Sequence, residues 1–211
     1  MATSTGPSSR RETFTEQARR AQLIEVTCDL IAANGYSGTS LAGIAEAAGI
    51  TKAAVLYYFP SKAAVIDATY EAVLAALTSD MAAAVGAARP ETAPAAYVRS
   101  MIDHLRDHPR HVRVLAEAAQ QGETGHSRRD RWQPLATLFE TAGSGSGETT
   151  TDPRTLAVII GGAIDGIVTE RLHDPSFDSR HAAETLIAML SQFTHPSNAA
   201  PVRPTEPEEQ A

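Results

Sequence analysis

The stretch LAGIAEAAGITKAAVLYYFP, residues 41–60, decides the predicted fold. Ala45 is small where two helices must approach each other, and Gly49, four residues later, permits a turn between them. Val55, six residues further on, is apolar where a second helix would seat on the first. Three further apolar residues would complete a small core, namely Ile44, Ile50 and Phe59. We interpret the stretch as a helix-turn-helix, because all of these positions agree.

The second helix of this unit would present one stripe of side chains outward. Lys52, Ala53, Leu56 and Tyr57 follow the spacing i, i+1, i+4 and i+5, which places them away from Val55. A lysine can donate to guanine acceptors, an alanine allows close approach, and leucine or tyrosine can touch thymine methyl groups. The stripe therefore suits the major groove of DNA. Partial packing into the core is the alternative for the tyrosines.

Polar groups flank the stripe where phosphates would lie. Thr51, Tyr58 and Lys62 offer hydroxyls and a cation suited to the DNA backbone. The N-termini of the two helices add free N–H groups, a further site for an anion. Lys52 and Lys62 are the only lysines of the chain, and both fall where DNA contact is expected. Solvated surface charge is the alternative for this pair.

Helical patterns continue on both sides of this stretch. Thr13 and Glu16 have capping-box spacing, which predicts a first helix that ends at Asn34-Gly35. Asp152-Pro153 reads as a cap followed by proline in the first helical position. Ser40 and Thr51 can cap the next two helices, which are expected near 41–48 and 52–58. Further helices are expected near 62–84, 92–107, 112–121, 128–142, from 153 onward, and 179–193. No strand pattern appears and alanine, the best helix former, is the commonest residue, so the predicted fold class is all-α.

Composition bounds the class of protein. The chain has 211 residues, of which 43% are hydrophobic and 20% charged, as in a globular protein of one or two domains. The formal net charge of −7 argues against a nucleic-acid partner until the chain is divided at Lys62. Residues 1–62 hold six Lys and Arg against five Asp and Glu, whereas residues 63–211 hold twelve against twenty. The acidity therefore belongs to the second part, and the first is near neutral.

The single cysteine, Cys28, excludes an internal disulfide and a Cys-rich zinc site, and we expect it to be a small core residue. The N-terminus lacks the apolar run of a secretory signal, and no apolar run is long enough to span a membrane. We therefore expect a cytoplasmic protein without a membrane partner. No nucleophile motif, phosphate-binding glycine loop or paired carboxylates stand out, so neither an enzyme nor a cofactor is predicted.

Residues 16–66 closely resemble the N-terminal domain of the tetracycline-repressor-like (TetR) family of transcriptional regulators. The matching residues are Leu23-Ile24, Asn34-Gly35-Tyr36, Thr39-Ser40-Leu41, Ile44-Ala45, Ala48-Gly49-Ile50-Thr51-Lys52 and Tyr57-Tyr58-Phe59-Pro60-Ser61-Lys62. The residues predicted to contact DNA are Ser40, Thr51, Lys52, Ala53, Ala54, Leu56, Tyr57, Tyr58 and Lys62. Leu56 stands where the family usually has tyrosine, so apolar contact is the most that it can offer.

The resemblance implies a three-helix DNA-binding head joined through the fourth helix to a helical body that binds a ligand and dimerises. The predicted divisions are a disordered arm at 1–12, the helix-turn-helix domain at 13–60, the body at 61–194 and a disordered tail at 195–211. The last two helices, with Gly162-x-x-x-Gly166 and the apolar residues Leu186, Leu190 and Phe193, would build the interface of a homodimer. Packing within one chain is the alternative for these residues.

We expect an apolar cavity in the body for an unknown small-molecule effector. Its candidate lining residues are Met101, His104, Leu105, Trp132, Phe139 and Ile164, with plain core packing as the alternative for each. Asp165 is a buried polar candidate, for which a structural hydrogen bond or an ion pair is the first expectation. The predicted function is a repressor that the effector releases from double-stranded operator DNA.

A competing hypothesis is a small helical enzyme or metal-binding protein. His104, His108 and His111 have the spacing i, i+4 and i+7, which could bring three imidazoles together as in a metal sensor. Pro109 interrupts the helical pattern inside this cluster, so a solvated polar helix end is the alternative. We predict no metal site on this basis.

Overall fold

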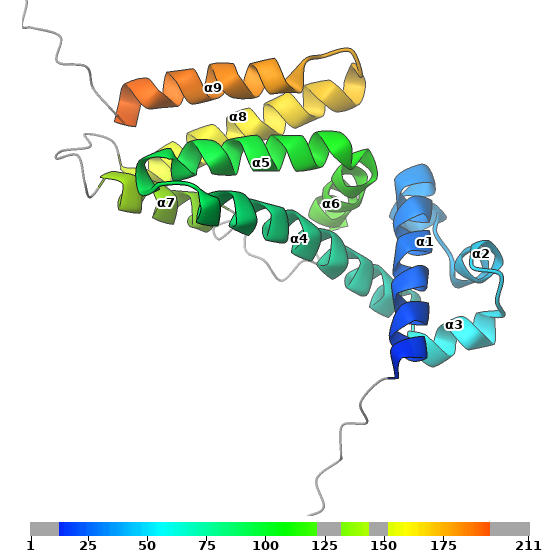
Figure 1. The fold of residues 1–211 in the computed structure, drawn as a ribbon. Coiled ribbons are helices and arrows are strands. Elements are labelled where there is room, and N and C mark those ends of the chain that lie inside the picture. The colour runs from blue at the N-terminus through cyan, green and yellow to red at the C-terminus, as the bar shows by residue number, and fades with distance from the viewer. Residues whose placement is uncertain (1–12, 122–131, 144–151, 195–211) are drawn as a thin grey trace, which may run out of the picture. The chain divides into compact units, whose positions relative to one another are not determined.

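The computed structural model describes residues 13–121, 132–143 and 152–194 (Figure 1). In these ranges every regular element is helical and no strand occurs, so the all-α prediction is confirmed. The elements are α1 (Phe14–Gly38), α2 (Leu41–Ala47), α3 (Lys52–Tyr58), α4 (Lys62–Ala87), the 3-10 turn η1 (Pro90–Thr92), α5 (Ala93–Asp107), α6 (Pro109–Gln121), α7 (Gln133–Gly143), α8 (Pro153–His173) and α9 (Ser179–Thr194). The predicted arm at 1–12 and tail at 195–211 lie outside the described residues.

Local hydrogen bonds begin the first helices at the predicted residues. Thr13 Oγ1 accepts from the amide of Glu16 at 3.3 Å, and the Glu16 carboxylate accepts from the amide of Thr13 at 2.8 Å. Ser40 and Thr51 each cap the next helix by accepting, at 3.1 Å, from the amide three residues further on. Gly49 adopts a φ of +67° in the turn between α2 and α3. The helix-turn-helix therefore forms as its sequence predicts.

Two helix boundaries differ from the prediction. Pro109 separates α5 from α6 as predicted, but α6 begins at Pro109 itself and not at Val112, because the first position of a helix needs no amide hydrogen. The first helix bends at Gly35, where φ is 69° and ψ is 176°, and its last turn continues to Gly38. This bend leads directly into the cap of α2.

The chain divides into two compact units. Among the described residues, the first unit comprises 13–82 and 103–121, and the second comprises 83–102, 132–143 and 152–194. The first unit thus contains the helix-turn-helix, most of α4 and also α6. The functional division at residue 60 stays a prediction.

In the first unit α1 packs most extensively on α6 and also on α2 and α3. Its core is made of Leu23, Cys28, Ile31, Ile44, Ala45, Ala48, Val55, Phe59, Val65, Ile66, Val73 and Val114. Cys28 belongs to this core, as predicted, and burial raises the pKa of its thiol to about 11. The helix-turn-helix is thereby seated on a common core with α4 and α6.

In the second unit α8 packs on α7 and α9, and η1 packs on α7 (Figure 1). A Cβ added to Gly161 of α8 would overlap the indole ring of Trp132, whereas one added to Gly162 or Gly166 would meet no atom within 4 Å. The close approach in this unit therefore occurs at Gly161. No helix of the described residues is both long and apolar enough to cross a membrane.

Candidate nucleic-acid interface

Helix α3 presents the predicted stripe at its surface. Val55 and Phe59, on its inner side, are 0% and 1% exposed. Tyr57 is 69% and Leu56 is 39% exposed, and Lys52 and Ala53 are exposed as well. The structure thus brings these four side chains to the surface of one short helix, supported from beneath by two fully buried residues.

The flanking residues divide into exposed and half-buried groups. Ser40 and Thr51 are exposed at the starts of α2 and α3. Their oxygens accept the capping hydrogen bonds, and a hydroxyl that accepts can also donate to a phosphate oxygen. Ala54 and Tyr58 are half-buried, and Tyr58 packs partly against the core.

Lys62 lies at the first position of α4, half-buried against the end of α1. Its Nζ donates to the carbonyl oxygen of Tyr36 at 2.7 Å and lies 4.5 Å from the centre of the Tyr36 ring. A phosphate would have to share this ammonium group with Tyr36. The predicted contact of Lys62 with the DNA backbone stays a prediction.

Helix α1 fastens α3 through residues that sequence reasoning did not connect with it. Arg20 Nη1 donates to the carbonyl oxygen of Tyr58 at 2.5 Å, and its guanidinium lies 4.3 Å from the centre of the Phe59 ring. Tyr57 Oη donates to Glu16 Oε1 at 3.2 Å. No local pattern could reveal the bond of Arg20, because its partner lies 38 residues further along the chain.

The geometry is that of a short, capped helix with one exposed face. Comparison with known proteins places this helix within a recognised domain. Residues 23–69 match the family model described as bacterial regulatory proteins, tetR family. The chain therefore carries a domain of this family at residues 23–69. The HTH-type transcriptional regulator RutR of Escherichia coli K12 is 35% identical over 102 residues, 46% of either chain. The chain thus spans about half the length of the curated relatives that it matches.

Solved structures share the fold over most of the chain. A TetR-like transcriptional regulator from Rhodococcus sp. RHA1 has a TM-score of 0.69 and 22% identity, over 82% of this chain and 94% of its own. A transcriptional regulator from Saccharomonospora viridis, solved in complex with choline, has a TM-score of 0.68 and 18% identity, over 83% and 96%. Both of these proteins are described as regulators of transcription.

The six candidate lining residues of the effector cavity fall in both compact units. Met101, Phe139 and Ile164 are buried in the second unit, and Trp132 is half-buried there against Gly161. His104 is buried and Leu105 half-buried in the first unit. Their part in binding an effector stays a prediction.

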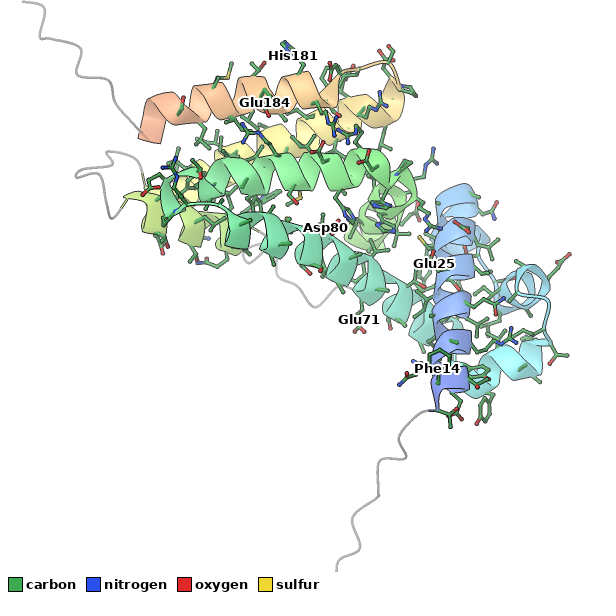
Figure 2. All side chains as sticks on the ribbon, viewed as in Figure 1. Phe14, Glu25, Glu71, Asp80, His181 and Glu184 are labelled. Atoms are coloured by element: carbon green, nitrogen blue, oxygen red, sulfur yellow. The ribbon has the colours of Figure 1, made fainter. Side chains whose placement is uncertain are left out.

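The three histidines come together as their spacing suggests. His104 Nδ1 lies 2.6 Å from Asp80 Oδ2, and its Nε2 lies 3.0 Å from His111 Nδ1 (Asp80 is labelled in Figure 2). His108 stacks on His111 with ring centres 4.8 Å apart and planes 15° from parallel. The ring of His104 is tilted by 42° to that of His108 and by 33° to that of His111. In the described part of the chain, no three His, Cys, Asp or Glu side chains are arranged to hold a metal.

Apolar side chains remain at the surface of the last two helices. Val158 and Ile159 of α8 are 54% and 59% exposed, and Met189 of α9 is 54% exposed. Gly162 lies in open space one turn from Val158. Leu186 and Leu190 are buried within the unit, and the side chain of Phe193 lies outside the described residues.

Proposed function

We propose that the chain is a sequence-specific DNA-binding regulator of transcription, and that it acts as a repressor. The observation that carries this proposal is the exposed stripe of Lys52, Ala53, Leu56 and Tyr57. It lies on the side of α3 opposite the buried Val55, within a tetR-family domain. Lysine and small or apolar groups on an exposed helix are suited to reading base edges in the major groove. Such a regulator acts on the chromosome, which places it in the cytoplasm.

We further propose that two copies bind one operator. A single seven-residue α3 offers few base contacts, and a two-fold dimer doubles them on half-sites about 34 Å apart or a related spacing. The exposed Val158, Ile159 and Met189 support an interface built from α8 and α9. Gly162, where an added Cβ meets nothing within the chain, would let the partner helix approach closely.

A small molecule bound in the 61–194 region is proposed to release the repressor. The Saccharomonospora viridis regulator, which shares the fold, was solved in complex with choline, which supports a small-molecule site in a protein of this fold. A ligand releases DNA only if it binds the DNA-incompetent state better. A tenfold loss of operator affinity requires about 1.4 kcal/mol of such coupling.

Selection from a random pool of duplex DNA tests the proposal. The purified chain is expected to enrich a palindromic sequence, and to bind it at moderate salt at least about a hundredfold more tightly than a scrambled duplex. The upstream region of its own gene is the first natural fragment to try in a gel shift. Equal affinity for selected and scrambled duplexes would overturn the proposal.

A further inference from the structure

One face of α6 is turned toward α1 within the first unit. Arg110, Val114 and Glu117 follow the spacing i, i+4 and i+7 and so lie on one stripe of α6. Val114, in the middle, is 2% exposed in the common core. Arg110 donates to Asp29 at 2.8 Å and to Glu25 at 2.7 Å, both on α1 (Glu25 is labelled in Figure 2). These carboxylates are exposed, so solvent screens the two ion pairs.

Glu117, at the other end of the stripe, makes a different kind of contact. Its Oε2 accepts from the backbone amide of Tyr36 at 2.9 Å, and the side chain is half-buried. Because the backbone bends at Gly35, the Tyr36 amide is turned away from the carbonyl groups of its own helix. It therefore needs an acceptor from another part of the chain. A Cβ added to Gly35 would lie 3.3 Å from both carboxylate oxygens. Glycine therefore serves both the positive φ and the approach of Glu117.

Residues 35–39 form a short corner that leads into the helix-turn-helix. The carbonyl of Tyr36 accepts from Lys62 of α4, and Thr39 Oγ1 donates to the carbonyl of Gly35 at 2.9 Å. Thr39 is 2% exposed and directly precedes Ser40, the cap of α2. Residues 35–39 thus join α1, α2 and α4, and Glu117 is the side chain that α6 contributes to this corner.

We propose that Glu117 is a positioning residue for DNA recognition, holding the 35–39 corner so that a displacement of α6 reaches the helix-turn-helix. This inference rests on the proposed function and deepens it, because it names a route by which the body would control the head. An acceptor on a rigid helix fixes the position of the bend at Gly35, near the end of α1, and this bend fixes where α2 begins. Base readout by α3 requires that position, whereas loose attraction to phosphates does not.

Glu117→Ala, Glu117→Asp and Glu117→Gln test the inference, with Glu71→Ala on the exposed side of α4 as the matched control. Hydrogen exchange of the Tyr36 amide is expected to rise about tenfold or more in Glu117→Ala, while amides in the middle of α1 keep their protection. Glu117→Asp, with an acceptor one methylene short, should show a smaller rise and spares the fold. Glu117→Gln keeps an acceptor oxygen and should restore most of the protection.

Affinity for the selected duplex is expected to fall about tenfold in Glu117→Ala, with affinity for a scrambled duplex unchanged. Unchanged exchange at Tyr36, or equal losses on both duplexes, would overturn the positioning role. A wild-type chain with no sequence preference would instead overturn the proposed function and the role in recognition built on it. The Tyr36 amide would then still decide whether Glu117 holds the corner.

Discussion

The ammonium group of Lys62 lies 2.7 Å from the carbonyl oxygen of Tyr36 and 4.5 Å from the centre of its ring. Lys62 therefore links the first turn of α4 to the last residues of α1. Of the two lysines in the chain, Lys52 is exposed on α3, whereas Lys62 is half-buried and bonds to Tyr36 within the fold. The two should respond differently to substitution.

Lys62→Ala is expected to weaken binding to all DNA sequences and to lower the slope of log affinity against log salt by about one, through loss of one phosphate contact. It should also lower the free energy of unfolding by about 1–2 kcal/mol, because the Tyr36 carbonyl loses a charged donor. Salt titrations and urea unfolding measure the two effects, with Arg89→Ala, an exposed charge of the second unit, as the control. Lower stability with an unchanged salt slope would show that Lys62 serves Tyr36 alone.

Lys52→Ala is expected to cost about 1–3 kcal/mol of binding free energy at one base pair, if its ammonium reads a guanine. Lys52 is exposed at the first position of α3, so stability should change little. Affinities for the selected duplex and for its single-base variants give the measurement. An equal loss on selected and scrambled duplexes would assign Lys52 to phosphate instead.

The sequence predicts those features correctly whose interacting residues lie within a few positions of one another. The caps at Thr13, Ser40 and Thr51 form because each oxygen meets an amide three residues away. The outward stripe on α3 follows from helical spacing around Val55. The bonds of Arg20 to Tyr58 and of Glu117 to Tyr36 could not be predicted, since their partners lie 38 and 81 residues apart and only the packed helices bring them together.

Gly161→Ala is expected to destabilise the second unit by about 1–3 kcal/mol, because the new methyl group would overlap the ring of Trp132. Gly86→Ala, near the end of α4 in the same unit, meets no atom within 4 Å and should gain up to about 1 kcal/mol from helix propensity. Thermal and urea unfolding of the two variants compare a glycine packed against Trp132 with one that has no neighbour within 4 Å. Similar effects of the two substitutions would contradict the close approach at Gly161.

Ile159→Glu is expected to convert a dimer into monomers, since it would place a carboxylate in the apolar surface proposed as the interface. Sedimentation velocity measures the change. Phe14→Glu makes the same kind of substitution at a residue that is 86% exposed on α1 and should leave the dimer intact. A dimer that survives Ile159→Glu would place the interface elsewhere.

The stack of His104, His108 and His111 should make the stability of the first unit sensitive to mild acid. Burial lowers the pKa of His111 below its usual value, and His108, His104 and Arg110 act in the same direction, against an opposing effect of Glu25. The carboxylate of Asp80 faces the stack from α4 and bonds His104, and Asp103, Arg106 and Asp107 carry the neighbouring charges at the end of α5.

A histidine with a lowered pKa in the folded state binds fewer protons than in the unfolded chain, whose histidines titrate near about 6.5. Its contribution to stability is therefore complete above that pH and is lost as pH falls toward the folded-state pKa. The free energy of unfolding in urea should decline between pH 7.5 and 5.5 by at most about 1.4 kcal/mol per pH unit for this group. His111→Gln removes the titrating ring and should flatten that decline, whereas His181→Gln removes an exposed ring of α9 as the control (Figure 2). The same decline in wild-type protein and His111→Gln would show that the buried ring is not the group that acid protonates.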